Sequence, residues 1–106
     1  MKILLYSKSN FIQDELNKES SFFKDLTVIK SLENIKRDIK SNSYLVILHH
    51  LNDFENDIDL FSNLLKEYKN IYLIALSNTP TNLEGCKLLR VGYKSYLHAL
   101  SNYQIL

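Results

Sequence analysis

Short apolar runs, separated by segments with helical spacing, dominate this chain. The clearest runs cover residues 3–6, 44–48 and 71–76, and weaker ones cover 26–29 and 93–97. Continuous apolar runs of this length are typical of strands that are covered on both faces, as in parallel sheets. We therefore expect five strands that are buried on both sides.

The segments between these runs have the apolar spacing of helices. Apolar residues recur three or four positions apart in three segments: Ile12 and Leu16; Leu32, Ile35 and Ile39; and Ile58, Phe61, Leu65 and Tyr68. Such spacing gathers the apolar side chains of a segment on one stripe of a helix. Strands and helices thus alternate along the chain, which predicts an open parallel sheet with helices on both faces, an α/β three-layer sandwich.

A fourth helix has recognisable ends. Thr81 and Glu84 form the T-x-x-E pattern of a capping box, and Gly92 stands where a left-handed C-terminal cap would lie. Three apolar residues at a spacing of three are expected to form its buried face, with the cysteine as a small core residue: Leu83, Cys86 and Leu89.

Composition narrows the class without naming a function. The 106 residues suit one domain, residues 1–106, and 45% hydrophobic with 24% charged residues is typical of a globular chain. A net charge of +1 gives no attraction to a polyanion, so we expect no direct nucleic-acid binding. One cysteine excludes an internal disulfide. No apolar run is long enough for a secretory signal or a membrane span, which predicts a cytoplasmic protein.

Polar residues follow the apolar runs directly. Parallel sheets bind ligands at the carboxyl ends of their strands, so these residues are the first candidates for a site. They are Ser7, Lys8, His49, His50, Ser77, Asn78 and His98. None of them is a carboxylate, and Mg²⁺ is usually held by Asp or Glu oxygens. We therefore expect a cleft without a metal ion or other cofactor.

Acidic residues alternate just after the third run, at Asp53, Glu55, Asp57 and Asp59. A calcium loop starting at Asp53 would need glycine at its sixth place and glutamate at its twelfth, where this chain has Ile58 and Leu64. Acidic side chains before a helix are sufficiently explained by the positive end of the helix dipole.

Four segments resemble the receiver domain of bacterial two-component response regulators: 2–6, 43–48, 74–77 and 92–97. The last of them is the most specific, and the resemblance extends over nearly the whole chain. It implies a parallel sheet in the strand order 2-1-3-4-5, the flavodoxin-like arrangement.

The resemblance also locates the family's working positions. Ser7 and Lys8 stand where receivers have the acidic pair that holds Mg²⁺. His49 stands at the position of the phospho-accepting aspartate, and Ala99 at that of a lysine that contacts the phosphoryl group. Ser77 keeps the hydroxyl position after the fourth strand. These five residues would form a degenerate phosphorylation pocket.

A second set of positions matches the parts that receivers use to change shape. Tyr96 occupies the aromatic switch position of the fifth strand, and we expect it to form a switch or interface region together with Ser77 and Tyr93. The resemblance thus implies a receiver without phosphotransfer chemistry: a phosphorylation-independent regulatory interaction module and not an enzyme. We further expect it to be the N-terminal part of a transcriptional regulator. Two alternatives stay open: phosphorylation at an unusual residue, and a small flavodoxin-like ligand-binding protein.

The end of the chain departs from the family. Receivers close with a helix after the fifth strand, where this chain has only residues 101–106. Without that helix part of one sheet face would be bare, and soluble monomers rarely expose a large apolar patch. We therefore expect a truncated final helix and a protein partner, either another protein or a second copy bound at the face of the fourth helix and fifth strand.

Overall fold

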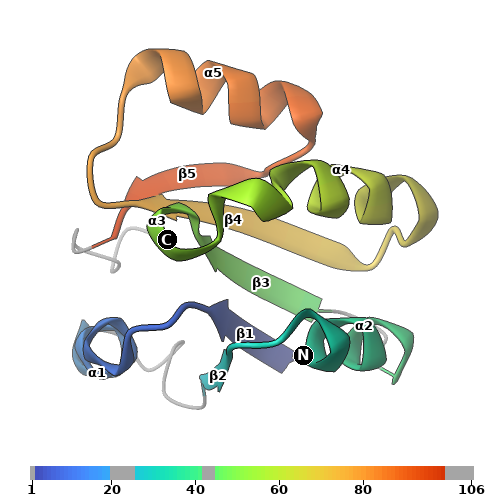
Figure 1. Cartoon of the computed structure of the whole chain (residues 1–106), viewed down its shortest axis with the longest axis horizontal. Coiled ribbons are helices and arrows are strands. Elements are labelled where there is room, and N and C mark those ends of the chain that lie inside the picture. Colours follow the sequence, from blue (N-terminus) through green and yellow to red (C-terminus); the bar gives the residue numbers. More distant parts are fainter. Residues whose placement is uncertain (1, 20–25, 42–44, 100–106) are drawn as a thin grey trace.

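The computed structural model describes residues 2–19, 26–41 and 45–99. These ranges contain a five-stranded parallel sheet in the order β2-β1-β3-β4-β5 (Figure 1). The strands are β1 (Lys2–Tyr6), β2 (Thr27–Ile29), β3 (Leu45–His50), β4 (Ile71–Ser77) and β5 (Ser95–His98). The predicted sheet and its order are confirmed, and β3 continues through both histidines instead of ending at Leu48.

Helices connect the strands as the alternating pattern predicts. They are α1 (Asn10–Glu19), α2 (Leu32–Ser41), α3 (Leu51–Phe54), α4 (Ile58–Glu67) and α5 (Asn82–Val91), with a short 3₁₀ helix η2 (Glu55–Asp57) between α3 and α4. Neither α3 nor η2 was expected from the apolar pattern of the sequence. None of the helices within the described ranges is long and apolar enough to cross a bilayer.

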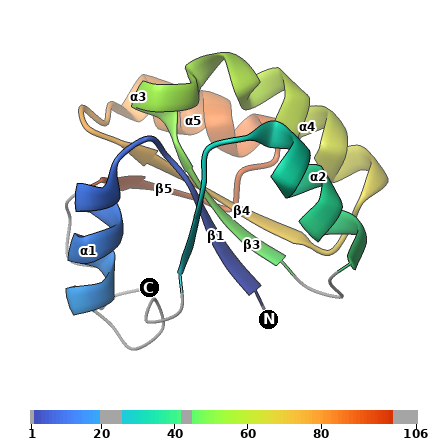
Figure 2. The same ribbon diagram turned by 60° about the horizontal axis from the view of Figure 1, so that its bottom comes forward.

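Helices cover both faces of the sheet, which confirms the three-layer sandwich. Figure 2 shows α1 on one side and α2, α4 and α5 on the other. Successive residues of each strand enter opposite clusters: Leu4 and Ile47 pack with Phe61 of α4, whereas Leu5 and Leu48 lie in the cluster of α1. This alternation is the period of two expected for strands buried on both faces.

Buried apolar residues line the face of the sheet on the α1 side. Val46, Ile74 and Leu76 on this face are buried, and Ile12 and Leu16 of α1 belong to the same cluster. The expectation that part of this face would be bare without a final helix stays a prediction. The expected truncated helix at residues 101–106 lies outside the described residues.

Both ends of α5 have the predicted caps. The Thr81 side chain accepts a hydrogen bond from the backbone N of Glu84, at 3.2 Å. Gly92 ends the helix with φ of 116°, a left-handed conformation that glycine adopts without the cost of a Cβ clash. Glu84 does not complete the reciprocal half of the capping box, because its carboxylate accepts a hydrogen bond from Tyr96 instead.

The predicted buried face of α5 is wrong. Leu83 is 84% exposed and Leu89 52% exposed, and Cys86 is exposed too, so it is not a core residue. The helix is instead buried at Gly85 and Leu88. The reason is the ring of Tyr96, which lies so close to the helix that a Cβ at position 85 would be 2.9 Å from it.

Candidate functional site

Strand register brings the polar residues to one end of the sheet. Tyr6 pairs with His49, His50 pairs with Leu76, and Ser77 pairs with His98. The segments that follow β1, β3 and β4 therefore meet at the carboxyl ends of the strands, where ligands of open α/β sheets bind.

His50 is the centre of this cleft. Its ring is only 3% exposed, yet both nitrogens have polar partners. Nδ1 lies 2.8 Å from Oδ2 of Asp53 and 3.1 Å from Oγ of Ser7. Nε2 lies 3.0 Å from Oδ1 of Asn78. One imidazole thus connects the loops after β1 and β4 with the helix that follows β3.

Asp53 supplies a carboxylate to the cleft, which corrects the expectation that the cleft has none. Its Oδ2 accepts hydrogen bonds from the backbone N of Lys8 at 2.7 Å and from Oγ of Ser7 at 3.0 Å, in addition to its contact with His50. Burial acts to raise the pKa of Asp53, but the hydrogen bonds from Lys8, His50 and Ser7 outweigh it and hold the pKa below its usual value.

The sequence did contain a signal for Asp53. Helix α3 starts directly after His50, so a residue three positions further on returns to the same side by one helical turn. Asp53 was not among the expected cleft residues because it does not directly follow an apolar run, and the helix dipole alone explains an acidic residue near a helix start. A histidine and an aspartate three apart at a strand-to-helix junction are the pattern that would have identified the pair.

Lys8 does not bring its ammonium group into the cleft. Its side chain is exposed, and Nζ lies 5.3 Å from the ring centroid of Phe54. The Phe54 ring is in turn stacked on Tyr6, with centroids 3.7 Å apart. Only the backbone N of Lys8 takes part in the cleft, through Asp53.

Ser77 and Ala99 lie at the ends of the neighbouring strands β4 and β5. Ser77 is the last residue of β4 and is buried, and its Oγ accepts a hydrogen bond from the backbone N of Thr79 at 3.1 Å. Ala99 is also buried, and its backbone N donates to the carbonyl of Ser77 at 2.8 Å. His98, beside Ala99, is exposed.

The structure places His49 apart from the other candidate pocket residues. Its ring is 0% exposed and lies on the same side of β3 as Leu45 and Ile47, whereas His50 faces the cleft. Nε2 of His49 is 2.7 Å from the carbonyl of Phe54, and Nδ1 is 2.7 Å from the Tyr93 hydroxyl. Because a carbonyl only accepts, Nε2 carries the hydrogen and Nδ1 accepts from Tyr93.

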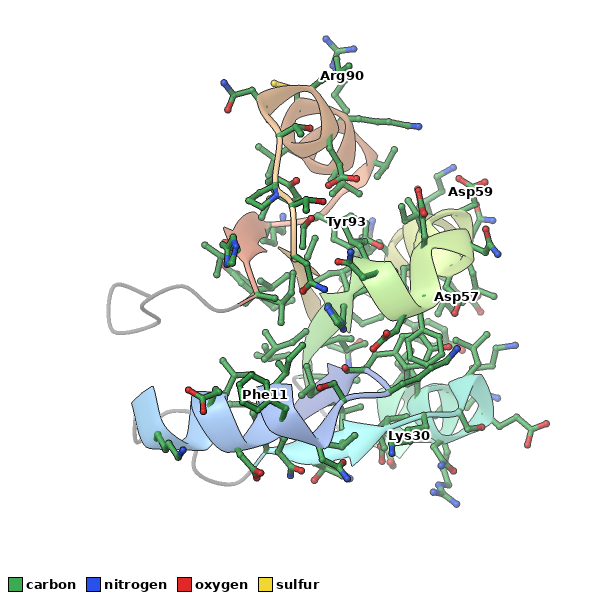
Figure 3. The ribbon with its side chains drawn as sticks, turned by 60° about the vertical axis from the view of Figure 1, so that its left-hand side comes forward. Phe11, Lys30, Asp57, Asp59, Arg90 and Tyr93 are labelled. Atoms are coloured by element: carbon green, nitrogen blue, oxygen red, sulfur yellow. The ribbon has the colours of Figure 1, made fainter. Side chains whose placement is uncertain are left out.

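Burial keeps the His49 ring neutral. Desolvation lowers the pKa of His49 to about 4, although the hydrogen bond to Phe54 and the charge of Asp57 act in the opposite direction. Burial also raises the pKa of Tyr93. The negative charges of Asp57 and Asp59, which are labelled with Tyr93 in Figure 3, raise it further. Both rings are thus uncharged structural groups at neutral pH.

Tyr96 connects β5 with the beginning of α5. Its hydroxyl donates to the Glu84 carboxylate at 2.5 Å and accepts from the backbone N of Thr81 at 2.9 Å. Burial and then the hydrogen bond to Glu84 raise the pKa of Tyr96. A hydrogen bond with the Ser77 side chain lowers the pKa of Tyr96. Ser77 and Tyr96 are therefore neighbours, whereas Tyr93 is attached to His49.

The cleft residues do not suit the divalent ion that the receiver resemblance implies. Among residues 2–19, 26–41 and 45–99, no three histidine, cysteine, aspartate or glutamate side chains are grouped so that they would hold a metal. Asp53 meets a histidine and a hydroxyl in place of further carboxylates. Mg²⁺ prefers several oxygen ligands in a nearly octahedral arrangement, which this set does not offer.

The Ser7, His50 and Asp53 side chains do not form a nucleophilic relay either. In such a relay the hydroxyl and the carboxylate bind opposite nitrogens of the histidine ring. Here both lie at Nδ1, and the Ser7 hydroxyl donates to Asp53 directly. Ser7 is also 0% exposed, so its oxygen is inaccessible to a substrate. These contacts join the loop after β1 to the end of β3 and to α3, and they do not place a base beside the Ser7 hydroxyl.

Comparison with known proteins supports the fold. No protein-family model matches the sequence, and no curated protein sequence does either. Among solved structures, HP1043, an orphan response regulator of H. pylori, is similar over 92% of this chain and 81% of its own, with a TM-score of 0.71 and 21% identity. An atypical orphan response regulator described as having a phosphorylation-independent regulatory mechanism covers the same shares, with a TM-score of 0.69 and 20% identity.

A third similar structure is that of a phosphorylated response regulator. A response regulator of Burkholderia pseudomallei with a phosphorylated aspartic acid and a calcium ion has a TM-score of 0.74 and 10% identity, over 98% of this chain and 62% of its own. Together these structures show that the chain has the receiver fold, which the sequence resemblance implied.

Proposed function

We propose that this receiver-fold chain is a regulatory interaction domain that works without phosphorylation, as the N-terminal part of a cytoplasmic transcriptional regulator, and has no enzymatic activity. The observation that carries the proposal is the contact between His50 and Asp53, at 2.8 Å, in the cleft where receivers carry out phosphotransfer. This internal pair replaces the acidic cluster and metal on which aspartyl phosphate formation depends. The likeness to a phosphorylation-independent regulator agrees with it.

Incubation with a small phosphodonor and Mg²⁺, followed by intact-protein mass measurement, tests this proposal. The expected result is an unchanged mass under conditions in which a phosphorylatable receiver is modified. Stoichiometric, hydroxylamine-sensitive addition of a phosphoryl group would contradict it and would favour the alternative, a receiver phosphorylated at an unusual residue. The Asp53→Asn variant is the matched control, because it would abolish such labelling if Asp53 were the acceptor.

The same proposal includes a docking surface on α5 and β5. Leu83 and Leu89 of α5 are exposed, and a groove of about 620 Å³ lies between this helix and β5, with Leu89, Tyr96 and Leu97 among its lining residues. Exposed leucines beside an apolar groove are typical of surfaces that bind another protein. A second copy of the chain is the partner that we propose.

Light scattering at low and high micromolar concentration tests the docking surface. The proposal expects a dimer that Leu83→Glu and Leu89→Glu each weaken, because a charge would then lie in the contact. Phe11→Glu is the control, since Phe11 is 60% exposed but lies on α1, on the opposite side of the sheet. A strict monomer at high micromolar concentration would contradict this part of the proposal.

A further inference from the structure

The protonation of His50 decides which contacts of the cleft can exist together. The buried His50 ring contacts Ser7 in the loop after β1, Asp53 on α3 and Asn78 in the loop after β4. The position of the ring hydrogens decides which of these contacts can form. The titratable groups nearby are Asp53 on α3, His49 on β3, whose ring is neutral, and Lys8 after β1, whose ammonium lies over Phe54. Asn78 and Ser7, the remaining neighbours, are uncharged.

Nδ1 of His50 has to carry a hydrogen. It faces Oδ2 of Asp53, and a carboxylate oxygen only accepts hydrogen bonds. The nearby Ser7 oxygen is an acceptor as well, because the Ser7 hydroxyl directs its own hydrogen to Asp53. A lone pair on Nδ1 would therefore face two acceptor oxygens.

Nε2 faces an acceptor on the other side of the ring. Its neighbour is the amide oxygen of Asn78, at 3.0 Å, so this contact also needs a hydrogen on the ring. With both nitrogens donating, the ring is an imidazolium whose positive charge is balanced by Asp53. A neutral ring would keep the hydrogen on Nδ1, opposite the carboxylate, and would lose the one that faces Asn78.

We propose that His50 is a proton-operated latch that ties the loop after β4 to Asp53 only while the ring carries both hydrogens. This proposal deepens the proposed function, on which it rests, by naming a proton as the signal that the cleft reads in place of a phosphoryl group. When the ring loses its Nε2 hydrogen, the Asn78 amide turns or moves away, and the loop over residues 78–81 loses one of its anchors.

The loop transmits this change toward α5. Asn78 stands at its start, where Asn52 Oδ1 also accepts from the Asn78 backbone N at 2.9 Å. Thr81 stands at its end and donates to the Tyr96 hydroxyl. Only two residues, Thr79 and Pro80, separate Asn78, which contacts His50, from Thr81, which contacts Tyr96. A change of the Asn78 side chain therefore acts on the short segment that also holds Tyr96 against Glu84.

Nuclear magnetic resonance of the ring nitrogens across the pH range of the folded protein tests the latch. At the acidic end both nitrogens of His50 should carry hydrogens, whereas His49 should stay neutral with its hydrogen on Nε2. As the pH is raised, the Nε2 hydrogen of His50 should be lost, and the amides of Asn78, Thr79 and Thr81 should shift in step with it. A His50 ring that is neutral at every pH at which the protein is folded, or loop amides that do not follow the ring, would overturn the proposal.

Two variants separate the latch from a general effect of pH. Asp53→Asn removes the balancing charge and should leave His50 with one hydrogen at a pH at which the native ring has two. Glu55→Gln removes an exposed charge close by and should change nothing. If Asp53→Asn does not fold, Asn78→Ala, at an exposed position, serves instead: the loop amides should no longer follow the ring, and continued following would overturn the latch. The ring spectra do not depend on phosphate, so failure of the latch is distinguishable from failure of the proposed function.

Discussion

The hydroxyl of Tyr93 lies 2.7 Å from Nδ1 of His49, and both side chains are buried beneath the helices of one sheet face. This contact attaches the segment before β5 to the end of β3. It also satisfies the one acceptor of a neutral imidazole in a place from which water is excluded, and a buried polar atom without a partner is costly.

Replacing Tyr93 by phenylalanine should therefore destabilise the fold. The His49 acceptor loses its donor while the ring stays buried, for which a loss of about 1–3 kcal/mol in the free energy of unfolding is typical. Urea denaturation measures the loss. Tyr72→Phe, at a half-buried tyrosine of β4, is the matched control and should cost less. Equal losses in the two variants would show that the contact with His49 contributes nothing particular.

Acid should weaken the fold through His49. The pKa of this ring is lowered from 6.5 to about 4 by burial, so between these pH values the unfolded chain binds a proton that the folded chain does not. The free energy of unfolding should thus fall as the pH is lowered from about 6.5 to about 4, by on the order of 3 kcal/mol for this residue.

Denaturation series at several pH values isolate this contribution. Other groups also titrate in the range, so the informative quantity is the difference between the native chain and His49→Gln. The variant should be less stable at neutral pH and should lose less stability on acidification. Parallel pH profiles for the two proteins would mean that His49 is not the buried neutral group that its contacts describe.

The hydroxyl of Tyr96 should be energetically coupled to Glu84. Their hydrogen bond, at 2.5 Å, joins β5 to the first turn of α5. In a double-mutant cycle with Tyr96→Phe and Glu84→Ala, a coupling of about 1 kcal/mol is expected for a charge-assisted hydrogen bond. A parallel cycle with Tyr96→Phe and Glu55→Ala should give none. Additive losses in the Glu84 cycle would remove the support for Tyr96 as a link between sheet and helix.

Features that depend on one segment at a time were predictable from the sequence. A strand buried on both faces needs an apolar residue at every position, so runs such as 71–76 are recognisable without their neighbours. The C-terminal cap of α5 was predictable for a similar reason, since Gly92 is the residue that adopts the left-handed conformation most easily. The order of the strands followed from the resemblance and not from these patterns.

Features that depend on contacts between two segments were not predictable from the sequence. The spacing of Leu83, Cys86 and Leu89 suggested the wrong face of α5. The buried face is set by the packing of Tyr96 on Gly85, and hydrophobicity does not identify a glycine as a contact residue. The two histidines raise the same difficulty at the cleft. Adjacent strand residues point to opposite sides, and whether His49 or His50 faces the cleft depends on a single residue of register.

Titration with Mg²⁺ and beryllofluoride, a phosphoryl analogue that binds receiver carboxylates together with the metal, tests the central claim most directly. Backbone amide spectra of the folded chain report whether the cleft binds either ion. The account predicts that the amides of Lys8, His50 and Asn78 keep their positions at millimolar concentrations of both. Saturable shifts of these three amides, absent without Mg²⁺, would show a working phosphorylation site and contradict the account.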